Sequence, residues 1–284
     1  MYVCGQEGLL KRIDHLIDTG NFPRFCIIVA GRGYGKKVIS EYIARRLNAT
    51  FAPCGSKAED TKEVVYNSYT VAEKTLYMFF DCDDMSINAK NAILKVTEEP
   101  PNNSYFVMTF QNIENCLNTL VSRGTVFTLD QYTQVDLEDY IEHKKYEFTD
   151  KTKSIIKQIC TCPEDIQTAY NMDIESVYSL ADKFIQFIGS ANLANELKII
   201  SMLNIKKEDK DKIDPIMFLR CILLCCNNYI IQPECSKEDT KVFHNIIKET
   251  SKALCDLSKK GCSKQIVLDN WIISTHMAIT GGEF

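Results

Sequence analysis

The chain has 284 residues, 45% of them hydrophobic and 25% charged, with a formal net charge of −5. A chain of this length can bury a large core, and it predicts two or three domains. The small negative charge excludes a protein that binds nucleic acid or anionic membranes through its overall charge. The most apolar segment, 216–226, is interrupted by Arg220 and is too short to cross a bilayer, so no membrane partner is expected.

The 13 cysteines are scattered and odd in number. A large core needs no disulfides, and the first residues lack the pattern of a secretory signal, so we expect reduced thiols in a cytoplasmic protein. Cys160-x-Cys162 and Cys225-Cys226 lack the second matching pair of a zinc site, and the four histidines stand apart. We therefore expect no bound metal.

The first predicted elements are a helix and a strand. Apolar residues recur at helical spacing over 9–17, and Gly20 and Pro23 follow as stop signals. Residues 25–29 form an apolar run rich in β-branched residues, which is typical of a buried strand. The chain then enters residues 30–37, which read AGRGYGKK, and a second amphipathic helix follows.

Strand, glycine-rich loop and helix are the context of a phosphate-binding loop, in which backbone N–H groups and a lysine hold phosphate. Two positions depart from that pattern: Ala30 replaces the first glycine, and Lys37 replaces the Ser or Thr whose hydroxyl holds Mg²⁺. We predict a degenerate loop, formed by Ala30, Gly33, Gly35, Lys36 and Lys37, that binds ATP or ADP weakly and requires neither. The alternative is that Lys37 lets ADP or phosphate bind tightly without metal.

Residues 48–75 are polar and show little periodicity, whereas residues 76–80 predict a second buried strand. This strand ends in Asp81, Asp83 and Asp84, as a parallel strand does when it delivers carboxylates to the rim of a sheet. For Asp83 and Asp84 we expect a solvated loop and helix cap rather than a metal-binding role. Ser86 can cap the helix that follows, and two prolines at 100–101 end it. Further strands are predicted at 105–110 and 126–129.

Three motifs now stand in order: NAILK at 91–95, EEPP at 98–101 and Ser-Arg at 122–123. Together they resemble the clamp-loader branch of the AAA+ ATPases. The family usually has a cysteine after the Ser-Arg pair, where this chain has Gly124. GQE at 5–7 and FPR at 22–24 extend the resemblance back to about residue 3, in a segment that lines the adenine pocket of nucleotide-binding members. The resemblance over residues 3–129 implies an α/β P-loop AAA+ module, a parallel sheet with flanking helices.

Beyond residue 129 the resemblance is one of architecture. Residues 136–170 read as short helices. Periodicity predicts further helices over 176–188, 191–204, 214–230, 237–258 and 263–279. By analogy with the family we expect a P-loop α/β domain over 1–130, a helical lid over 131–175 and an all-α collar or oligomerisation domain over 176–284.

The resemblance assigns roles to the acidic strand end. An active AAA+ site needs an aspartate that holds Mg²⁺ through water and a glutamate that activates the attacking water. An ungapped alignment on 91–101 places Asp81 at the glutamate position and Phe80 at the aspartate position, and a shift by one residue places Asp81 and Cys82 there. Neither register restores both carboxylates. Asp81 is therefore expected to be the remnant of a degenerate Walker B motif in a chain that does not hydrolyse ATP.

Arg123 has an expected role outside the chain's own site. In the family, the equivalent arginine reaches into the ATP site of the neighbouring subunit. A guanidinium suits this task because it is always charged and meets phosphate oxygens through a planar fork. The resemblance implies that Arg123 is catalytic in trans, as an arginine finger, with Ser122 in support. The alternative is an ordinary surface arginine.

A lost site together with a retained Ser-Arg pair is most similar to the delta prime type of subunit, the stator-like, non-hydrolysing member of the bacterial DNA polymerase III clamp loader. The resemblance implies a hetero-oligomer in DNA replication, with clamp-loader ATPase subunits and a delta-like subunit as partners. The sliding clamp would be reached indirectly, and primer-template DNA through the complex. Two alternatives stay open: a working clamp-loader ATPase with an unusual nucleotide site, and an interaction protein that keeps a AAA+ shell.

Overall fold

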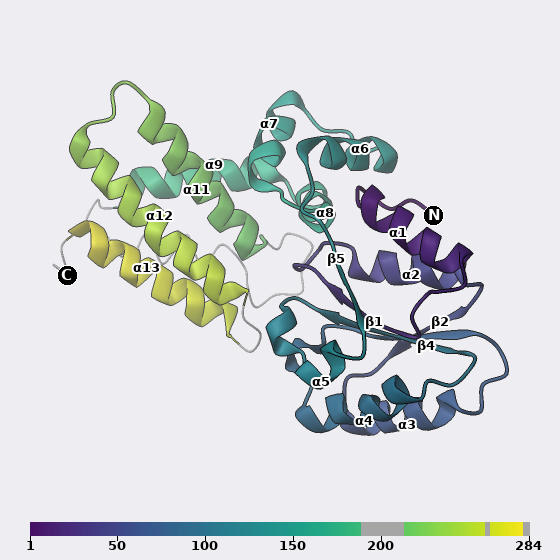
Figure 1. Ribbon diagram of the computed structural model, residues 1–284. Helices are drawn as coiled ribbons and strands as arrows, with labels where there is room; N and C mark the ends of the chain where they lie inside the picture. Colours follow the sequence, from purple (N-terminus) through teal and green to yellow (C-terminus); the bar gives the residue numbers. More distant parts are fainter. Residues whose placement is uncertain (189–212, 259–261, 281–284) are drawn as a thin grey trace. The chain divides into compact units, whose positions relative to one another are not determined.

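The computed structural model describes residues 1–188, 213–258 and 262–280 (Figure 1). The chain divides into two compact units. The first unit contains Met1–Glu142 together with Cys162–Glu164, and the second contains His143–Thr161 and the residues from Asp165 onward. The division into three domains with boundaries at 130 and 175 stays a prediction.

Within the described residues, a parallel sheet of five strands forms the centre of the first unit. The strands are β1 (Phe25–Val29), β2 (Thr50–Cys54), β3 (Thr75–Phe79), β4 (Ser104–Phe110) and β5 (Thr125–Thr128). Their order is β2-β3-β4-β1-β5, and every neighbouring pair is parallel. β3 and β4 are buried along their whole length, which explains why they read as continuous apolar runs. The carboxyl ends of β1, β3 and β4 therefore meet at one edge.

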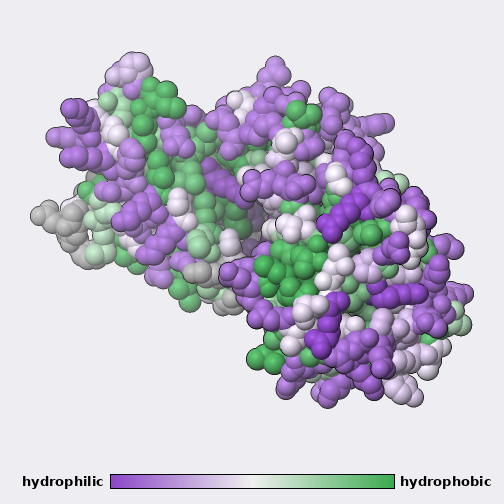
Figure 2. Space-filling model, viewed as in Figure 1, coloured by the Kyte–Doolittle hydropathy of each residue, from purple (hydrophilic) through white to green (hydrophobic). Residues whose placement is uncertain are grey.

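Helices cover both faces of this sheet (Figure 1). The helices against the sheet are α1 (Glu7–Asp18), α2 (Lys36–Arg46), α3 (Ala58–Ser68), α4 (Ile87–Glu98) and α5 (Asn118–Val121). The 3-10 turns η1 (Cys82–Asp84) and η2 (Ile113–Asn115) lie in the connections, and α6 (Gln134–Lys144) follows β5. Ile13 and Ile43 of α1 and α2 are fully buried on one face, and Ile93 and Leu120 of α4 and α5 on the other. Figure 2 shows mostly hydrophilic side chains on the visible surface of this unit, as expected when apolar helix faces point toward a sheet.

The predicted strands and the Ser86 cap are confirmed, with shifts of about one residue at strand ends. The Ser86 side chain accepts a hydrogen bond from the Ala89 N–H at 3.2 Å. Residues 48–75, which showed no clear pattern, contain β2 and α3. β2 is an edge strand that is at most half-buried and contains Pro53, and the fully buried residues of α3 are Thr61 and Ser68. Neither element therefore carries the apolar period from which it could be predicted.

The second unit is helical in its described residues. Its helices are α7 (Asp150–Ile159), α8 (Pro163–Asn171) from Asp165 onward, α9 (Ile174–Phe187), α11 (Pro215–Ile231), α12 (Lys237–Leu257) and α13 (Lys264–Thr280). Phe184, Phe218 and Trp271 bring three aromatic rings together at its core, with centroids 5.2 to 6.2 Å apart. The predicted helices match α9, α11, α12 and α13 closely, whereas the one expected over 191–204 lies outside the described residues. Among the described helices, none is both long and apolar enough to cross a membrane.

Candidate functional site

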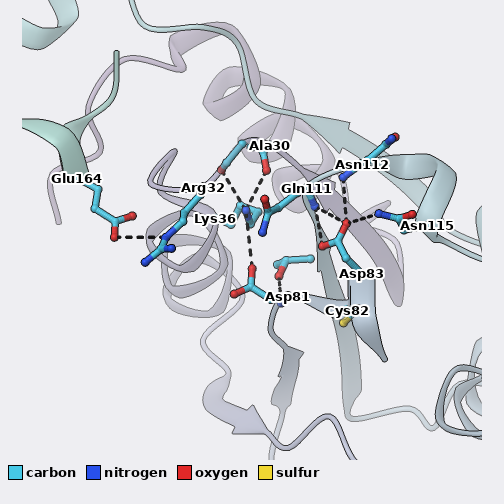
Figure 3. Close-up of polar contacts among 12 residues, drawn as sticks. Ala30, Arg32, Lys36, Asp81, Cys82, Asp83, Gln111, Asn112, Asn115 and Glu164 are labelled. Carbon is cyan, nitrogen blue, oxygen red and sulfur yellow. Dashed lines mark hydrogen bonds and ion pairs between the residues drawn. The ribbon is translucent and has the colours of Figure 1, made fainter. Parts of the chain in front are cut away.

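The predicted phosphate loop lies between β1 and α2, at the carboxyl edge of the sheet where parallel α/β folds bind ligands (Figure 3). Gly33 and Gly35 have φ values of +80° and +82°, in the left-handed region that favours glycine. Gly35 is the N-cap of α2, so the loop leads directly into the first N–H groups of a helix. The backbone of the loop thus has the connectivity that phosphate binding requires.

Lys36 is turned back onto this loop. Its Nζ donates hydrogen bonds to the carbonyl oxygens of Ala30 at 2.9 Å and Gly31 at 3.0 Å, and lies 4.0 Å from Asp81 Oδ1 (Figure 3). The lysine side chain is only 9% exposed. The structure therefore brings together Ala30, Lys36 and Asp81, as expected from the sequence, and it satisfies the ammonium group with the loop's own oxygens.

Lys37 points along α2. Its Nζ lies 3.8 Å from Glu41 Oε1, one helical turn later, and the side chain is exposed. An ion pair of this kind on a helix surface contributes only a few tenths of a kcal/mol. Lys37 offers no hydroxyl at the position where a phosphate loop holds Mg²⁺.

Asp81 is the second residue after β3, and its backbone N–H donates to Thr109 Oγ1 at 2.9 Å. Phe80, on one side of it, packs against the apolar core beneath α1 and α2. Cys82, on the other side, is completely buried, and this burial raises the pKa of its thiol to about 12. Both positions that could supply a second carboxylate therefore hold apolar groups facing the core, so the site does not fit a hydrated Mg²⁺ ion.

Asp83 joins two loops at the sheet edge (Figure 3). Its carboxylate accepts hydrogen bonds from the backbone N–H groups of Gln111 and Asn112 and from the side-chain amide of Asn115, at 2.9 to 3.1 Å. Burial acts to raise the pKa of Asp83, but these hydrogen bonds outweigh it and hold the pKa below its usual value. Lys90 adds a further link, because its Nζ donates to the carbonyls of Asn115 at 2.7 Å and Asp83 at 3.3 Å. Asp83 is thus hydrogen-bonded within the fold, whereas the sequence led us to expect a solvated position.

We expect Asp83→Asn to lower the free energy of unfolding at pH 7 by about 1–3 kcal/mol, because it removes charge-assisted hydrogen bonds. The folded pKa of Asp83 is lowered, so its stabilisation is complete above the unfolded-state pKa of about 3.9 and is lost as the pH falls through the folded value. The difference between wild type and variant should therefore shrink below about pH 4. Urea denaturation across pH measures it, with Asp84→Asn as the exposed neighbouring control. A difference that is constant with pH would contradict this account.

Arg123 lies just after the end of α5, and it bonds to residues of α4 and α5 rather than to the phosphate loop. Its Nη1 donates to the carbonyl of Thr119 at 2.8 Å, and its Nη2 donates to Glu98 Oε1 of α4 at 2.7 Å. The Ser122 hydroxyl also donates to the Thr119 carbonyl, at 3.2 Å. These bonds hold the guanidinium in one orientation, and the Arg123 side chain is 35% exposed.

Gly124 departs from the cysteine usual in the family, and its surroundings explain the departure. A β-carbon at this position would lie 2.8 Å from the ring of Phe25, which is closer than real side chains allow. The first strand therefore leaves no room for a side chain beside Arg123.

The structure adds two residues to the loop's surroundings that the sequence motifs did not indicate, Tyr132 and Glu164. The Tyr132 hydroxyl donates to the Tyr34 carbonyl at 2.9 Å, and Glu164 Oε1 lies 3.9 Å from Arg32 Nε. Both stand far after the loop in the sequence, so no local spacing connects them to it. The only signal was Gly33 itself, a glycine at a position where phosphate loops accept any residue.

The N-terminal GQE segment also has an observed role. The side-chain amide of Gln6 exchanges two hydrogen bonds with the backbone of Asp130, each 2.8 Å long. Cys4 and Gly5 lie against Asp136, in the same stretch of chain after β5. These contacts tie the beginning of the chain to the segment that follows the sheet.

Sequence comparisons match the first part of the chain. The family model described as "DNA polymerase III, delta subunit" matches residues 56–133. The DNA polymerase III subunit gamma of Buchnera aphidicola subsp. Schizaphis graminum is 24% identical over 172 residues, which cover 50% of this chain and 47% of that protein. The subunit tau of Escherichia coli (strain K12) is 25% identical over 172 residues, covering 50% of this chain and 27% of tau. The chain thus spans less than half of these relatives.

Solved structures share the fold over most of the chain. A DNA polymerase III gamma subunit-related protein of Thermotoga maritima has a TM-score of 0.51 at 14% identity, covering 95% of this chain and 99% of that chain. A point variant of the Thermotoga maritima RuvB protein also has a TM-score of 0.51, at 15% identity, covering 98% of this chain and 88% of the other. The fold is an AAA+ α/β module followed by a helical region. In its motifs, its sequence relatives and its fold, the chain is similar to the clamp-loader branch of the AAA+ proteins.

Proposed function

We propose that this chain is a non-hydrolysing subunit of a DNA polymerase sliding-clamp loader, of the delta prime type, that supplies Arg123 to the ATP site of a neighbouring subunit. The observation that carries the proposal is the chain's own site. Lys36 is hydrogen-bonded to the loop carbonyls of Ala30 and Gly31, Lys37 replaces the Mg²⁺-binding hydroxyl, and Asp81 stands between Phe80 and Cys82 without a second carboxylate beside it.

If the chain's own site does no chemistry, an arginine at the end of α5 can act only on a nucleotide that a partner subunit holds. Arg123 is anchored through Glu98 and Thr119, and part of its side chain remains exposed. In that setting a positive charge can meet the γ-phosphate of a nucleotide held by another chain, where it stabilises the charge that spreads over the transferred group. Ser122 supports this role by closing the turn at Thr119.

The partners in this proposal are clamp-loader ATPase subunits and a delta-like subunit, and through them the sliding clamp and primer-template DNA. The second unit suits an association role because α13 exposes Ile266, Ile273 and Met277 at helical spacing on its surface. Exposure of these apolar side chains to water is unfavourable, and covering them with another surface lowers the free energy. In this proposal the helices of the second unit are the collar that holds the subunits together.

A working ATPase is the second candidate, because Lys36 and Asp81 lie at the usual edge of the sheet and the sequence relatives are named gamma and tau. In that case Asp81 would have to serve both as a metal-binding group and as the base for water. One carboxylate cannot perform both tasks in one step, which is why we place this candidate second.

Nucleotide binding separates the two candidates. We expect the purified chain to bind ATP weakly at best. Mg²⁺ should not raise the affinity, because position 37 has no hydroxyl to hold the metal. Lys37→Thr restores the hydroxyl but not the second carboxylate, so it should strengthen binding only slightly in the presence of Mg²⁺ and leave it unchanged in EDTA. Calorimetry with and without Mg²⁺ measures both, with Lys11→Thr on α1 as the charge-matched control. Micromolar affinity of the wild type that depends on Mg²⁺ would favour the working ATPase.

A further inference from the structure

Glu164 lies against the phosphate loop at Gly33. A β-carbon built on Gly33 would lie 2.8 Å from Glu164 Cβ, 2.9 Å from Glu164 Oε2 and 2.6 Å from Cys162 Sγ. Cys162 and Glu164 belong to the same compact unit as the loop, and the Cys162 thiol faces the Arg32 carbonyl at 3.8 Å. Gly33 is therefore a glycine for two reasons: its φ of +80°, and the close approach of these two side chains.

The close approach of Glu164 places a carboxylate beside a loop whose expected ligand, a phosphate, is also negatively charged. Phosphate loops hold phosphate through backbone N–H groups and a lysine, so a carboxylate beside the loop opposes the ligand unless a metal ion lies between the two negative groups. A carboxylate within about 5 Å of a bound phosphate opposes it by Coulomb repulsion, which is strong enough in a partly buried site to reduce affinity at least tenfold. Tyr132 also lies against the loop, because its hydroxyl donates to the carbonyl of Tyr34.

We propose that Glu164 is a specificity-determining residue that excludes polyphosphates from the loop, so that the chain's own carboxylate closes the site against nucleotides. This inference rests on the proposed function, since a subunit that lends an arginine to its neighbour need not respond to ATP itself. It assigns the loss of binding to a charge placed on the loop, in addition to the loss of the Mg²⁺-binding hydroxyl at position 37.

Arg32 moderates this exclusion without cancelling it. Its Nε lies 3.9 Å from Glu164 Oε1, but the two side chains are 71% and 50% exposed (Figure 3). An ion pair this exposed is weakened by water and salt, so Arg32 neutralises Glu164 only in part. The same screening weakens the repulsion between Glu164 and a second anion, so the effect of Glu164 should be largest at low ionic strength. Arg32 also attracts anions by itself. Removal of Arg32 and removal of Glu164 should therefore change phosphate affinity in opposite directions.

Pyrophosphate without Mg²⁺ tests the charge effect alone, because metal ligation then plays no part. Calorimetry on the full chain at low ionic strength should give at least tenfold tighter pyrophosphate binding for Glu164→Gln than for wild type, and weaker binding for Arg32→Gln. The advantage of Glu164→Gln should shrink as salt rises, because screening reduces repulsion. Glu147→Gln, an equal change of net charge at an exposed position in the second unit, should bind like wild type.

Equal affinity of wild type and Glu164→Gln for pyrophosphate, whether weak or tight, would overturn the role of Glu164. Thermal melts of each variant without ligand confirm that the near-isosteric change has not unfolded the loop, and Glu164→Ala repeats the test with the side chain removed. The proposed function is judged separately, by ATP hydrolysis and by Arg123. A wild-type chain that hydrolyses ATP would end that proposal, whereas the ratio between Glu164→Gln and wild type decides only what Glu164 does.

Discussion

Arg123→Ala is expected to slow ATP hydrolysis at the neighbouring subunit's site by about a thousandfold, the usual effect of removing such a group from a nucleotide hydrolase. The altered chain should still fold and assemble, because the Arg123–Glu98 pair is partly exposed and contributes less than about 1 kcal/mol. Single-turnover hydrolysis in the assembled complex, stimulated by clamp and primer-template DNA, is the measurement. Total turnover should fall less than this, since other interfaces keep their own arginines, while clamp loading, which needs the sites to act together, should fail.

The controls for Arg123 separate charge from geometry. Arg123→Lys should rescue little, because an ammonium group lacks the planar fork that meets two phosphate oxygens. Ser122→Ala should be milder, since the hydroxyl donates only to the Thr119 carbonyl. Arg46→Ala on α2 also removes an arginine from a carboxylate pair, with Asp14 at 2.7 Å, and should leave hydrolysis unchanged. Wild-type rates in an Arg123→Ala complex of normal size would make Arg123 an ordinary surface residue.

Trp271→Ala is expected to destabilise the second unit by about 3–5 kcal/mol, the largest effect on stability that we predict for a single substitution. Trp271 is 2% exposed, stacks on Phe184 at 5.2 Å and meets Phe218 edge-on at 6.2 Å. Its Nε1 also donates to Thr250 Oγ1 at 3.0 Å, so the truncation leaves both a cavity and an unpaired buried hydroxyl. Urea denaturation followed by far-UV circular dichroism measures the loss.

Two variants of α13 calibrate that result. Trp271→Phe keeps most of the aromatic packing and should cost roughly half as much or less, mainly through the lost hydrogen bond to Thr250. Ile273→Ala on the same helix should change the unfolding free energy by less than about 1 kcal/mol, because Ile273 is 39% exposed. Trp271 is the single tryptophan of the chain, so its fluorescence in the wild type reports the unfolding of this unit specifically. A small effect of Trp271→Ala would mean that the aromatic cluster is not the core of the collar.

The buried elements of the first unit were predictable because one physical signal dominates each of them. β1, β3 and β4 are buried on both faces, so their apolar runs mark them, and Ser86 and the two prolines mark the ends of α4. β2 and α3 lack such a signal because they lie at the sheet's edge with few fully buried apolar side chains. The helices of the second unit were predictable in extent but not in the pairing of Phe184 with Trp271, which depends on tertiary packing.

The candidate site divides in the same way. Residues 30–37 and Asp81 could be predicted because local spacing links glycines, lysine and strand end, and the structure brings Lys36 to Asp81. Glu164 and Tyr132 could not, because they reach the loop only through folding across about a hundred residues of chain. Asp83 was predicted to be solvated, since a sequence does not reveal that the backbone of Gln111 and Asn112 will end beside it.

The central claim is that this chain gives an arginine to its neighbour and hydrolyses no ATP itself. The most direct test is to add the purified chain stepwise to its ATPase partners, prepared without it, in the presence of clamp and primer-template DNA. The quantity measured is the rate of phosphate release. The account predicts no release by the chain alone, a rise to a plateau at stoichiometric addition, and assembly without that rise for Arg123→Ala. Phosphate release by the isolated chain, or an equal rise with Arg123→Ala, would contradict it.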